Sequence, residues 1–293
     1  MLTQAPPRQR SLRGLSPHGF HRVVWHEWGD PCNPRVAICV HGLTRTGRDF
    51  DVLAEALAPT HRVMAVDMPG RGRSAWLPVK ADYGFATYLT TLTALIAASG
   101  AERVDWIGTS MGGLLGIVVA AQADSPVERL VVNDVGPAIE PAALERIKTY
   151  VGADPTFADW QAFGACVRAI SPFGPLTDAQ WEHLTRTVGA ERPDGRIGFV
   201  YDPGIAEPFR NAPAPPDLWP VWESVRCPTL LLRGALSDLL SAATARRMTE
   251  TGPRPRLVEF EGVGHAPMLL APDQVAAVVG FLRDAPAHGM ALA

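Results

Sequence analysis

The sequence predicts an α/β fold in which a mostly parallel central sheet carries helices on both faces. Short apolar runs, such as 36–40 and 62–66, alternate with helical patterns along the chain, which is typical of a parallel sheet covered by helices. The run at 36–40 is continuous, as expected for a strand buried on both faces. The length of 293 residues suits one such domain with an insertion.

The elements follow one another in a regular order. The range 20–28 is predicted as a strand or hairpin, and apolar runs predict further strands over 36–40, 62–66, 103–107, 127–132, 228–232 and 256–260. Helical spacing predicts helices over 49–57, 85–99 and 111–122, from about 241, and over 272–283. Gly100 fits the end of the second of these helices.

The alternation breaks between the strands at 127–132 and 228–232. Residues 138–222 are helical in pattern and rich in Trp and Phe. We therefore predict one α/β core, over 20–137 and 223–284, interrupted by a helical insertion over 138–222. Residues 1–19 and 285–293 are expected to be flexible termini.

Composition excludes several classes of protein. The net charge of −3 is too small to indicate nucleic acid or an anionic membrane surface as a partner. No run of 18 apolar residues predicts a membrane span, and the start has no secretory pattern. The four widely spaced cysteines are interpreted as free thiols in a cytoplasmic protein. No metal or cofactor is expected; the partner is a small molecule, and a homodimer is left open.

The segment Gly108-Thr-Ser-Met-Gly112 matches the pattern G-x-S-x-G. A predicted strand precedes it and a predicted helix follows it, which is the context of a catalytic serine on a tight turn. Flanking glycines remove the Cβ atoms that would collide with the neighbouring strand and helix. Ser110 is therefore the candidate nucleophile; the alternative is a packed turn whose serine only caps the helix.

A serine hydroxyl needs a base and an oriented imidazole to become nucleophilic. Among eight histidines, His265 follows the last predicted strand in a glycine-flanked loop, so it is the predicted base. Asp238 follows the strand at 228–232 and is the favoured acid, which gives the chain order Ser110, Asp238, His265. Asp134, which follows the strand at 127–132, is the rival acid.

These motifs resemble the α/β-hydrolase fold over about residues 20–284. His41-Gly42 resembles the oxyanion loop of that family, and Asp67-x-Pro-Gly-x-Gly-x-Ser74 resembles its turn after the next strand. The resemblance implies that the N–H groups of Leu43 and Met111 form the oxyanion hole, that His41 is structural, and that 138–222 is a helical cap over the site.

The expected function is hydrolysis of a carboxylic ester, lactone or thioester through an acyl-enzyme on Ser110. Cleavage of carbon–carbon bonds or perhydrolysis is an alternative within the fold, and a non-catalytic ligand receptor is an alternative of another class. The candidate substrate-binding residues are Arg45, Asp134, Trp160 and Trp181. Arg45 follows the oxyanion loop and could bind a substrate carboxylate.

Overall fold

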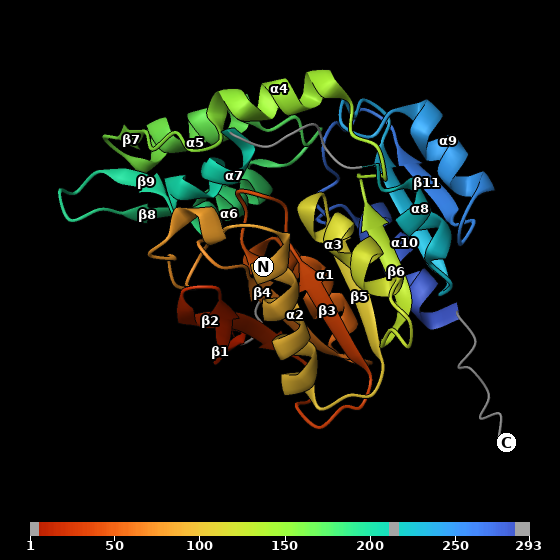
Figure 1. The fold of residues 1–293 in the computed structure, drawn as a ribbon. Coiled ribbons are helices and arrows are strands. Elements are labelled where there is room, and N and C mark those ends of the chain that lie inside the picture. Colours follow the sequence, from red (N-terminus) through yellow and green to blue (C-terminus); the bar gives the residue numbers. More distant parts are fainter. Residues whose placement is uncertain (1–5, 211–216, 285–293) are drawn as a thin grey trace, which may run out of the picture.

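The computed structural model describes residues 6–210 and 217–284. Its central sheet has eight strands in the order β1-β2-β4-β3-β5-β6-β10-β11 (Figure 1). The strands are β1 (Arg8–Ser16), β2 (Gly19–Trp28), β3 (Val36–Val40), β4 (Arg62–Asp67), β5 (Val104–Thr109), β6 (Val127–Asn133), β10 (Thr229–Gly234) and β11 (Arg256–Phe260). From β4 to β11 all neighbours are parallel, whereas β1–β2 and β2–β4 are antiparallel.

The N-terminal segment differs from the prediction. Residues 1–19 were expected to be flexible, but β1 pairs with β2 along its whole length, from Arg8 opposite Glu27 to Ser16 opposite Gly19. β1 is an edge strand with mostly exposed side chains, so its order comes from backbone pairing rather than from an apolar pattern. The expected flexibility of 285–293 concerns residues outside the described ranges.

Helices cover both faces of the sheet. One face packs against α2 (Phe85–Ser99), α3 (Met111–Ala120), α8 (Trp219–Ser224) and α9 (Ala242–Glu250), and the other against α1 (Asp51–Leu57) and α10 (Pro272–Asp284). In β3, Ile38 and Val40 belong to the first core cluster and Ala37 and Cys39 to the second. Every residue of β3 is buried, as the continuous apolar run predicted.

The part of the predicted insertion from α4 to α7, residues 141–210, is called the cap from here on and lies over one end of the sheet (Figure 1). It contains α4 (Pro141–Tyr150), α5 (Trp160–Ile170), α6 (Asp178–Val188) and α7 (Glu207–Arg210), and also a small sheet of β7 (Thr156–Phe157), β9 (Ile197–Phe199) and β8 (Gly189–Glu191). The insertion is therefore not purely helical. The predicted boundary at 222 falls inside α8, whose Trp222 is fully buried in the main core.

The turn after β4 joins the core to the cap. The N–H of Gly72 donates to Val200 O at 2.8 Å, and the N–H of Asp202 donates to Gly70 O at 2.8 Å.

Short 3-10 helices lie at Gly47–Phe50, Lys80–Asp82 and Pro203–Ala206.

Candidate active site

Ser110 occupies the turn between β5 and α3. Its backbone has φ 53° and ψ −115°, a conformation that L residues rarely adopt and that is common at functional sites. A Cβ on Gly108 would collide with the backbone of Gly112, and a Cβ on Gly112 would collide with the carbonyl of Val40. The glycines of the motif therefore permit the close approach of β3, β5 and α3 that supports this turn.

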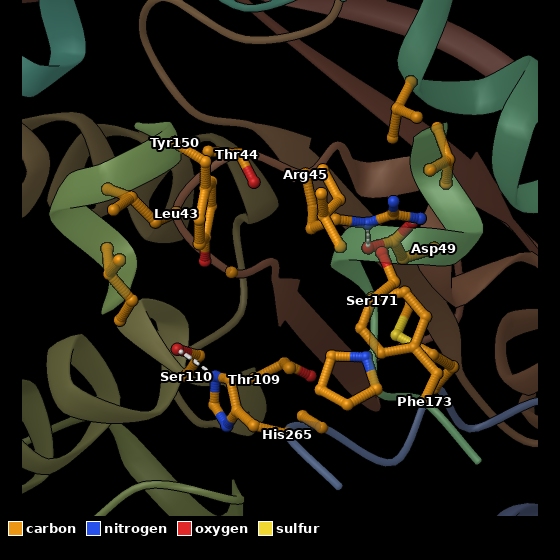
Figure 2. A pocket seen from close by; sticks show the side chains of 18 of the residues that line it. Leu43, Thr44, Arg45, Asp49, Thr109, Ser110, Tyr150, Ser171, Phe173 and His265 are labelled. Carbon is orange, nitrogen blue, oxygen red and sulfur yellow. Dashed lines mark hydrogen bonds and ion pairs between the residues drawn. The ribbon is translucent and has the colours of Figure 1, made fainter. Parts of the chain in front are cut away.

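His265 lies in the loop after β11 and faces Ser110. Its Nε2 is 3.0 Å from Ser110 Oγ, within the reach required of a general base. The imidazole is 14% exposed, so most of its surroundings are protein. The structure thus brings together the two residues that the sequence singled out first (Figure 2).

The carboxylate on the other side of this imidazole belongs to Asp134. Asp134 Oδ2 is 2.9 Å from His265 Nδ1, and Asp134 Oδ1 accepts the N–H of Gly234 at 3.2 Å. Asp134 is fully buried and follows β6 directly. A carboxylate at Nδ1 favours the tautomer with its proton on Nδ1, which leaves Nε2 free to accept the serine proton.

The prediction that Asp238 orients His265 is therefore wrong. Asp238 accepts hydrogen bonds from Arg146 Nε at 2.6 Å and Arg146 Nη2 at 2.9 Å, so it connects the core to α4 of the cap. Burial acts to raise the pKa of Asp238, but the hydrogen bonds and charge of Arg146, with a smaller contribution from the charge of His265, outweigh it and lower the pKa. Asp238 lies four residues beyond the end of β10, and its side-chain hydrogen bonds go to Arg146 and not to the imidazole.

Two backbone donors flank Ser110. In the described ranges, the N–H groups of Leu43 and Met111 have no hydrogen-bond partner. Met111 is the first residue of α3, where N–H groups are free and the helix dipole is positive. These donors suit a developing oxyanion.

His41 shapes the backbone that leads to Leu43. It is fully buried, its Nε2 accepts the N–H of Met68 at 3.0 Å, and its Nδ1 is 2.6 Å from Gly42 O. Because Nε2 accepts, Nδ1 carries the proton and donates to Gly42. Burial lowers the pKa of His41 to about 4, so the ring is neutral at pH 7 and can serve as both donor and acceptor.

A pocket leads to Ser110 between core and cap. Figure 2 shows Ser110 and His265 on one side of it and Arg45, Asp49 and Phe173 on the other. Arg45 Nε and Nη2 donate to Asp49 at 2.8 and 2.6 Å. The lining is completed by apolar cap side chains, among them Ile147, Val167, Ile170, Val188 and Phe199.

The tryptophans predicted to bind substrate lie elsewhere. Trp160 and Trp181 line a separate groove between α5 and α6 of the cap, and neither borders the pocket at Ser110. Trp181 stacks on Phe173 with ring centroids 6.0 Å apart, and Trp160 packs edge-on against Phe163. They stabilise the cap, which is a use of large aromatics that the sequence could not separate from substrate binding.

The described residues show neither a metal site nor a membrane-spanning helix. In residues 6–210 and 217–284, no group of three or more His, Cys, Asp or Glu side chains is placed to hold a metal ion. No helix in the described part of the chain is both long and apolar enough to cross a membrane.

Comparison with known proteins identifies the family of this chain. The alpha/beta hydrolase family model matches residues 37–278. A 3-hydroxybutyrate-oligomer hydrolase of Cupriavidus necator is 43% identical, over 96% of this chain and 99% of its own length. A pimeloyl-[acyl-carrier protein] methyl ester esterase of Pectobacterium atrosepticum is 27% identical, over 80% of this chain and 89% of its own.

The fold has a solved counterpart. The crystal structure of an alpha/beta hydrolase from Novosphingobium aromaticivorans shares 37% identity and superposes with a TM-score of 0.86, covering 96% of this chain and 99% of that one. The predicted α/β-hydrolase fold and the predicted class of enzyme, an ester-cleaving hydrolase, are both confirmed. The chain belongs to the alpha/beta hydrolase family.

Proposed function

We propose that this enzyme hydrolyses the ester bonds of short 3-hydroxybutyrate oligomers through an acyl-enzyme on Ser110. The observation that carries the chemistry is the continuous contact from Asp134 through His265 to Ser110 Oγ at 2.9 and 3.0 Å. The substrate class is supported by the relative from Cupriavidus necator, whose name gives that activity and which matches this chain nearly end to end.

Acylation begins with proton transfer from Ser110 Oγ to His265 Nε2 as the oxygen attacks the ester carbonyl. The carbonyl oxygen becomes an oxyanion held by the N–H groups of Leu43 and Met111, each of which is worth about 3 kcal/mol to the transition state. Asp134 remains ionised and stabilises the imidazolium. The intermediate then collapses: the bond to the alcohol oxygen breaks, and that oxygen takes the proton from His265.

Deacylation repeats the same steps with water. His265 Nε2 accepts a proton from water as its oxygen attacks the acyl carbon. The second tetrahedral intermediate uses the same two N–H groups, and its collapse releases the carboxylic acid while Ser110 regains its proton from His265. No other group is needed, because one base serves both halves of the reaction.

The pocket suits a substrate with a branched apolar chain and one charged end. Apolar cap residues such as Ile147 and Ile170 fit the methyl branches of a hydroxybutyrate unit. We propose that Arg45, whose side chain is 12% exposed in the pocket wall, binds the terminal carboxylate. Two of its nitrogens already pair with Asp49, which fixes the orientation of the third.

The test measures release of 3-hydroxybutyrate from its dimer and trimer, beside hydrolysis of p-nitrophenyl butyrate. We expect the wild-type enzyme to cleave all three and Ser110→Ala to lose roughly 10⁶-fold in kcat while keeping its circular dichroism spectrum. Ser224→Ala, the same change on an exposed side of α8, is the matched control and should leave kcat unchanged.

Two outcomes would contradict the proposal. Turnover of p-nitrophenyl butyrate without any cleavage of dimer or trimer would remove the substrate class but keep the serine chemistry. A wild-type protein that neither reacts with a fluorophosphonate nor cleaves any ester, a lactone or a β-diketone, yet is thermally stabilised by 3-hydroxybutyrate oligomers, would be a receptor of this fold.

A further inference from the structure

The turn after β4 carries a buried arginine that the catalytic cycle above does not use. Arg71 lies between Gly70 and Gly72, which have φ of 81° and 55°, and its residue is 0% exposed. Both glycines are bonded to the cap through Val200 and Asp202. The side chain is therefore held on the core side of the cap junction, out of contact with water.

The guanidinium contacts both residues of the oxyanion hole. Arg71 Nε donates to Leu43 O at 2.8 Å, and Arg71 Nη2 lies 3.9 Å from Met111 Sδ. Its Nη1 donates to Pro69 O and to Tyr88 Oη, both at 2.7 Å. One planar group with its donors in a fixed geometry thus joins the turn after β4, α2, the loop after β3 and the first residue of α3.

Arg71 makes no direct ion pair, although Asp202 accepts a hydrogen bond from Tyr83, whose ring lies 5.8 Å from the Arg71 guanidinium. Among the described residues, no carboxylate lies within 4.0 Å of its guanidinium nitrogens. The other fully or nearly buried arginines differ: Arg129 and Arg233 each pair with an acidic side chain. Burial of an unpaired charge costs free energy, which is partly offset here by carbonyl acceptors and by the rings of Tyr88 and Tyr83, 5.1 and 5.8 Å away.

A buried positive charge in contact with Leu43 and Met111 can stabilise a negative charge that forms beside their N–H groups. The negative charge that the proposed reaction creates beside Leu43 and Met111 is the oxyanion of the tetrahedral intermediate. A fixed cation in a water-excluded site stabilises such a charge without reorganisation. The hydrogen bond to Leu43 O also fixes the chain just after the N–H of Leu43, which sets the direction of that donor.

We propose that Arg71 is a positioning residue for the oxyanion hole, which holds Leu43 and Met111 in place and adds positive potential behind them. The proposal rests on the proposed function in one respect, namely that Leu43 and Met111 are the oxyanion donors. It concerns the transition state and not the ground state, since Arg71 does not line the pocket and its hydrogen bonds go to two backbone carbonyls and to Tyr88 Oη. That distinction makes it testable against a merely structural role.

The experiment compares two inhibitors that share the acyl chain of p-nitrophenyl butyrate. A trifluoromethyl ketone forms a bond from its carbonyl carbon to Ser110 Oγ, so that its oxygen becomes an anion in the oxyanion hole and the serine proton moves to His265. The corresponding methyl ketone binds mainly in its ground state. Transition-state analogues report on groups that act only in the transition state.

The variants are Arg71→Met, which removes the charge and the donors, and Arg71→Lys, which keeps the charge with a single nitrogen. We expect Arg71→Met to lose about 10- to 100-fold in kcat, less than loss of a direct oxyanion donor, with KM changed by less than about twofold. The Ki of the trifluoromethyl ketone should rise by the same factor as kcat falls, and that of the methyl ketone should stay nearly constant. Arg71→Lys should be intermediate in both.

Arg129→Met is the matched control. Arg129 is also buried, but it pairs with Asp105, which also lies 3.2 Å from His61 Nε2. We expect this variant to lose thermal stability with kcat and both Ki values unchanged. If Arg71→Met does not fold, the ratio of the Ki of the trifluoromethyl ketone to the Ki of the methyl ketone is measured in Arg71→Lys instead.

The proposal is overturned if kcat falls without loss of trifluoromethyl ketone affinity, or if Arg129→Met shows the same pattern as Arg71→Met. Failure of the proposed function has a different signature. An enzyme that cleaves p-nitrophenyl butyrate but no 3-hydroxybutyrate oligomer would lose its proposed substrate while the inhibitor test of Arg71 remains valid. Retention of activity in Ser110→Ala would remove the acyl-enzyme itself.

Discussion

Asp134 and Asp238 follow neighbouring strands of the same sheet and differ in almost every physical respect. Asp134 is fully buried, accepts one bond from His265 and one from Gly234, and has no solvent contact. The side chain of Asp238 is 45% exposed and pairs with Arg146, itself 35% exposed. Depth of burial, and not mere position after a strand, separates the carboxylate that orients the imidazole from the one that joins core to cap.

The cause of the difference is the distance along the chain from the end of the sheet. Asp134 directly follows Asn133, the last residue of β6, and its N–H donates to Leu232 O of β10 at 2.8 Å. The sheet therefore fixes its backbone. Asp238 comes after Gly234 and three further loop residues, so its position depends on the path of the loop and on what the cap offers.

The strongest test of this comparison exchanges each carboxylate for its amide. Asp134→Asn keeps the shape but supplies an N–H toward His265, which favours the wrong tautomer, and we expect kcat to fall on the order of 10⁴-fold. Asp238→Asn should change kcat less than about tenfold, because it breaks only a half-exposed ion pair. Initial rates with p-nitrophenyl butyrate decide between them, and a larger loss in Asp238→Asn would reverse the assignment.

Burial also changes how a histidine affects the stability of the fold as the pH varies. Burial lowers the pKa of His41 to about 4, whereas an unfolded histidine titrates near 6.5. The unfolded state therefore binds a proton first as pH falls, so His41 destabilises the fold progressively between pH 6.5 and pH 4, and by about 3 kcal/mol once that window is crossed. Above pH 6.5 it has no such effect.

Urea unfolding at several pH values measures this contribution. His41→Gln can still donate to Gly42 or accept from Met68 but does not titrate, so its free energy of unfolding should vary less between pH 6.5 and 4 than that of the wild type. The difference of the two curves isolates His41 from His21, whose pKa is also lowered by burial. Parallel curves in the two proteins would show that His41 is not the titrating group.

The smallest expected effect compares the two arginine–aspartate pairs at the pocket. Arg45 and Asp49 are largely buried, and Arg146 and Asp238 are half-exposed. The double change Arg45→Met with Asp49→Asn avoids an unpaired carboxylate and should raise KM for the free-acid dimer about tenfold, the worth of a charge-assisted contact, but not KM for its methyl ester. Arg146→Met with Asp238→Asn should change either KM less than about threefold.

Equal changes of KM for the acid and for the methyl ester in the Arg45 variant would show that this arginine does not bind the carboxylate. A selective loss of the acid in the Arg146 variant would transfer that role to the cap. Both comparisons use the same dimer assay, so the ratio of KM for the acid to KM for the ester is compared directly between the two variants.

Sequence patterns predicted the parts of the molecule that local chemistry determines. The sheet strands β3, β4, β5, β6, β10 and β11, Ser110 on its glycine-flanked turn and His265 after the last strand all follow from short-range signals. The edge strand β1 was missed because its residues alternate weakly and are mostly exposed. Because β1 pairs with β2 through its backbone, its side chains need not form an apolar pattern that a sequence reading could detect.

The errors at the site have one origin. Asp134 and Asp238 both follow a strand and both lie between Ser110 and His265 in the chain, so neither signal separates them. The prediction that Trp160 and Trp181 bind substrate rests on the suitability of aromatics for an apolar substrate. Which of two strand-end carboxylates reaches an imidazole depends on loop direction, and whether a cap tryptophan faces the pocket depends on how helices pack. The immediate adjacency of Asp134 to its strand was the signal that could have favoured it.

Gly112, two residues after the proposed nucleophile Ser110, limits how this enzyme can diversify. A Cβ at Gly112 would collide with the carbonyl of Val40, and a Cβ at Gly108 would collide with the backbone of Gly112. Neither glycine can therefore be replaced without a shift of the backbone. Cap positions such as Ile147 and Ile170 face the pocket without such contacts with the sheet. Substitutions in the cap can therefore change which acyl groups the enzyme accepts, while the residues proposed to break the ester bond stay the same.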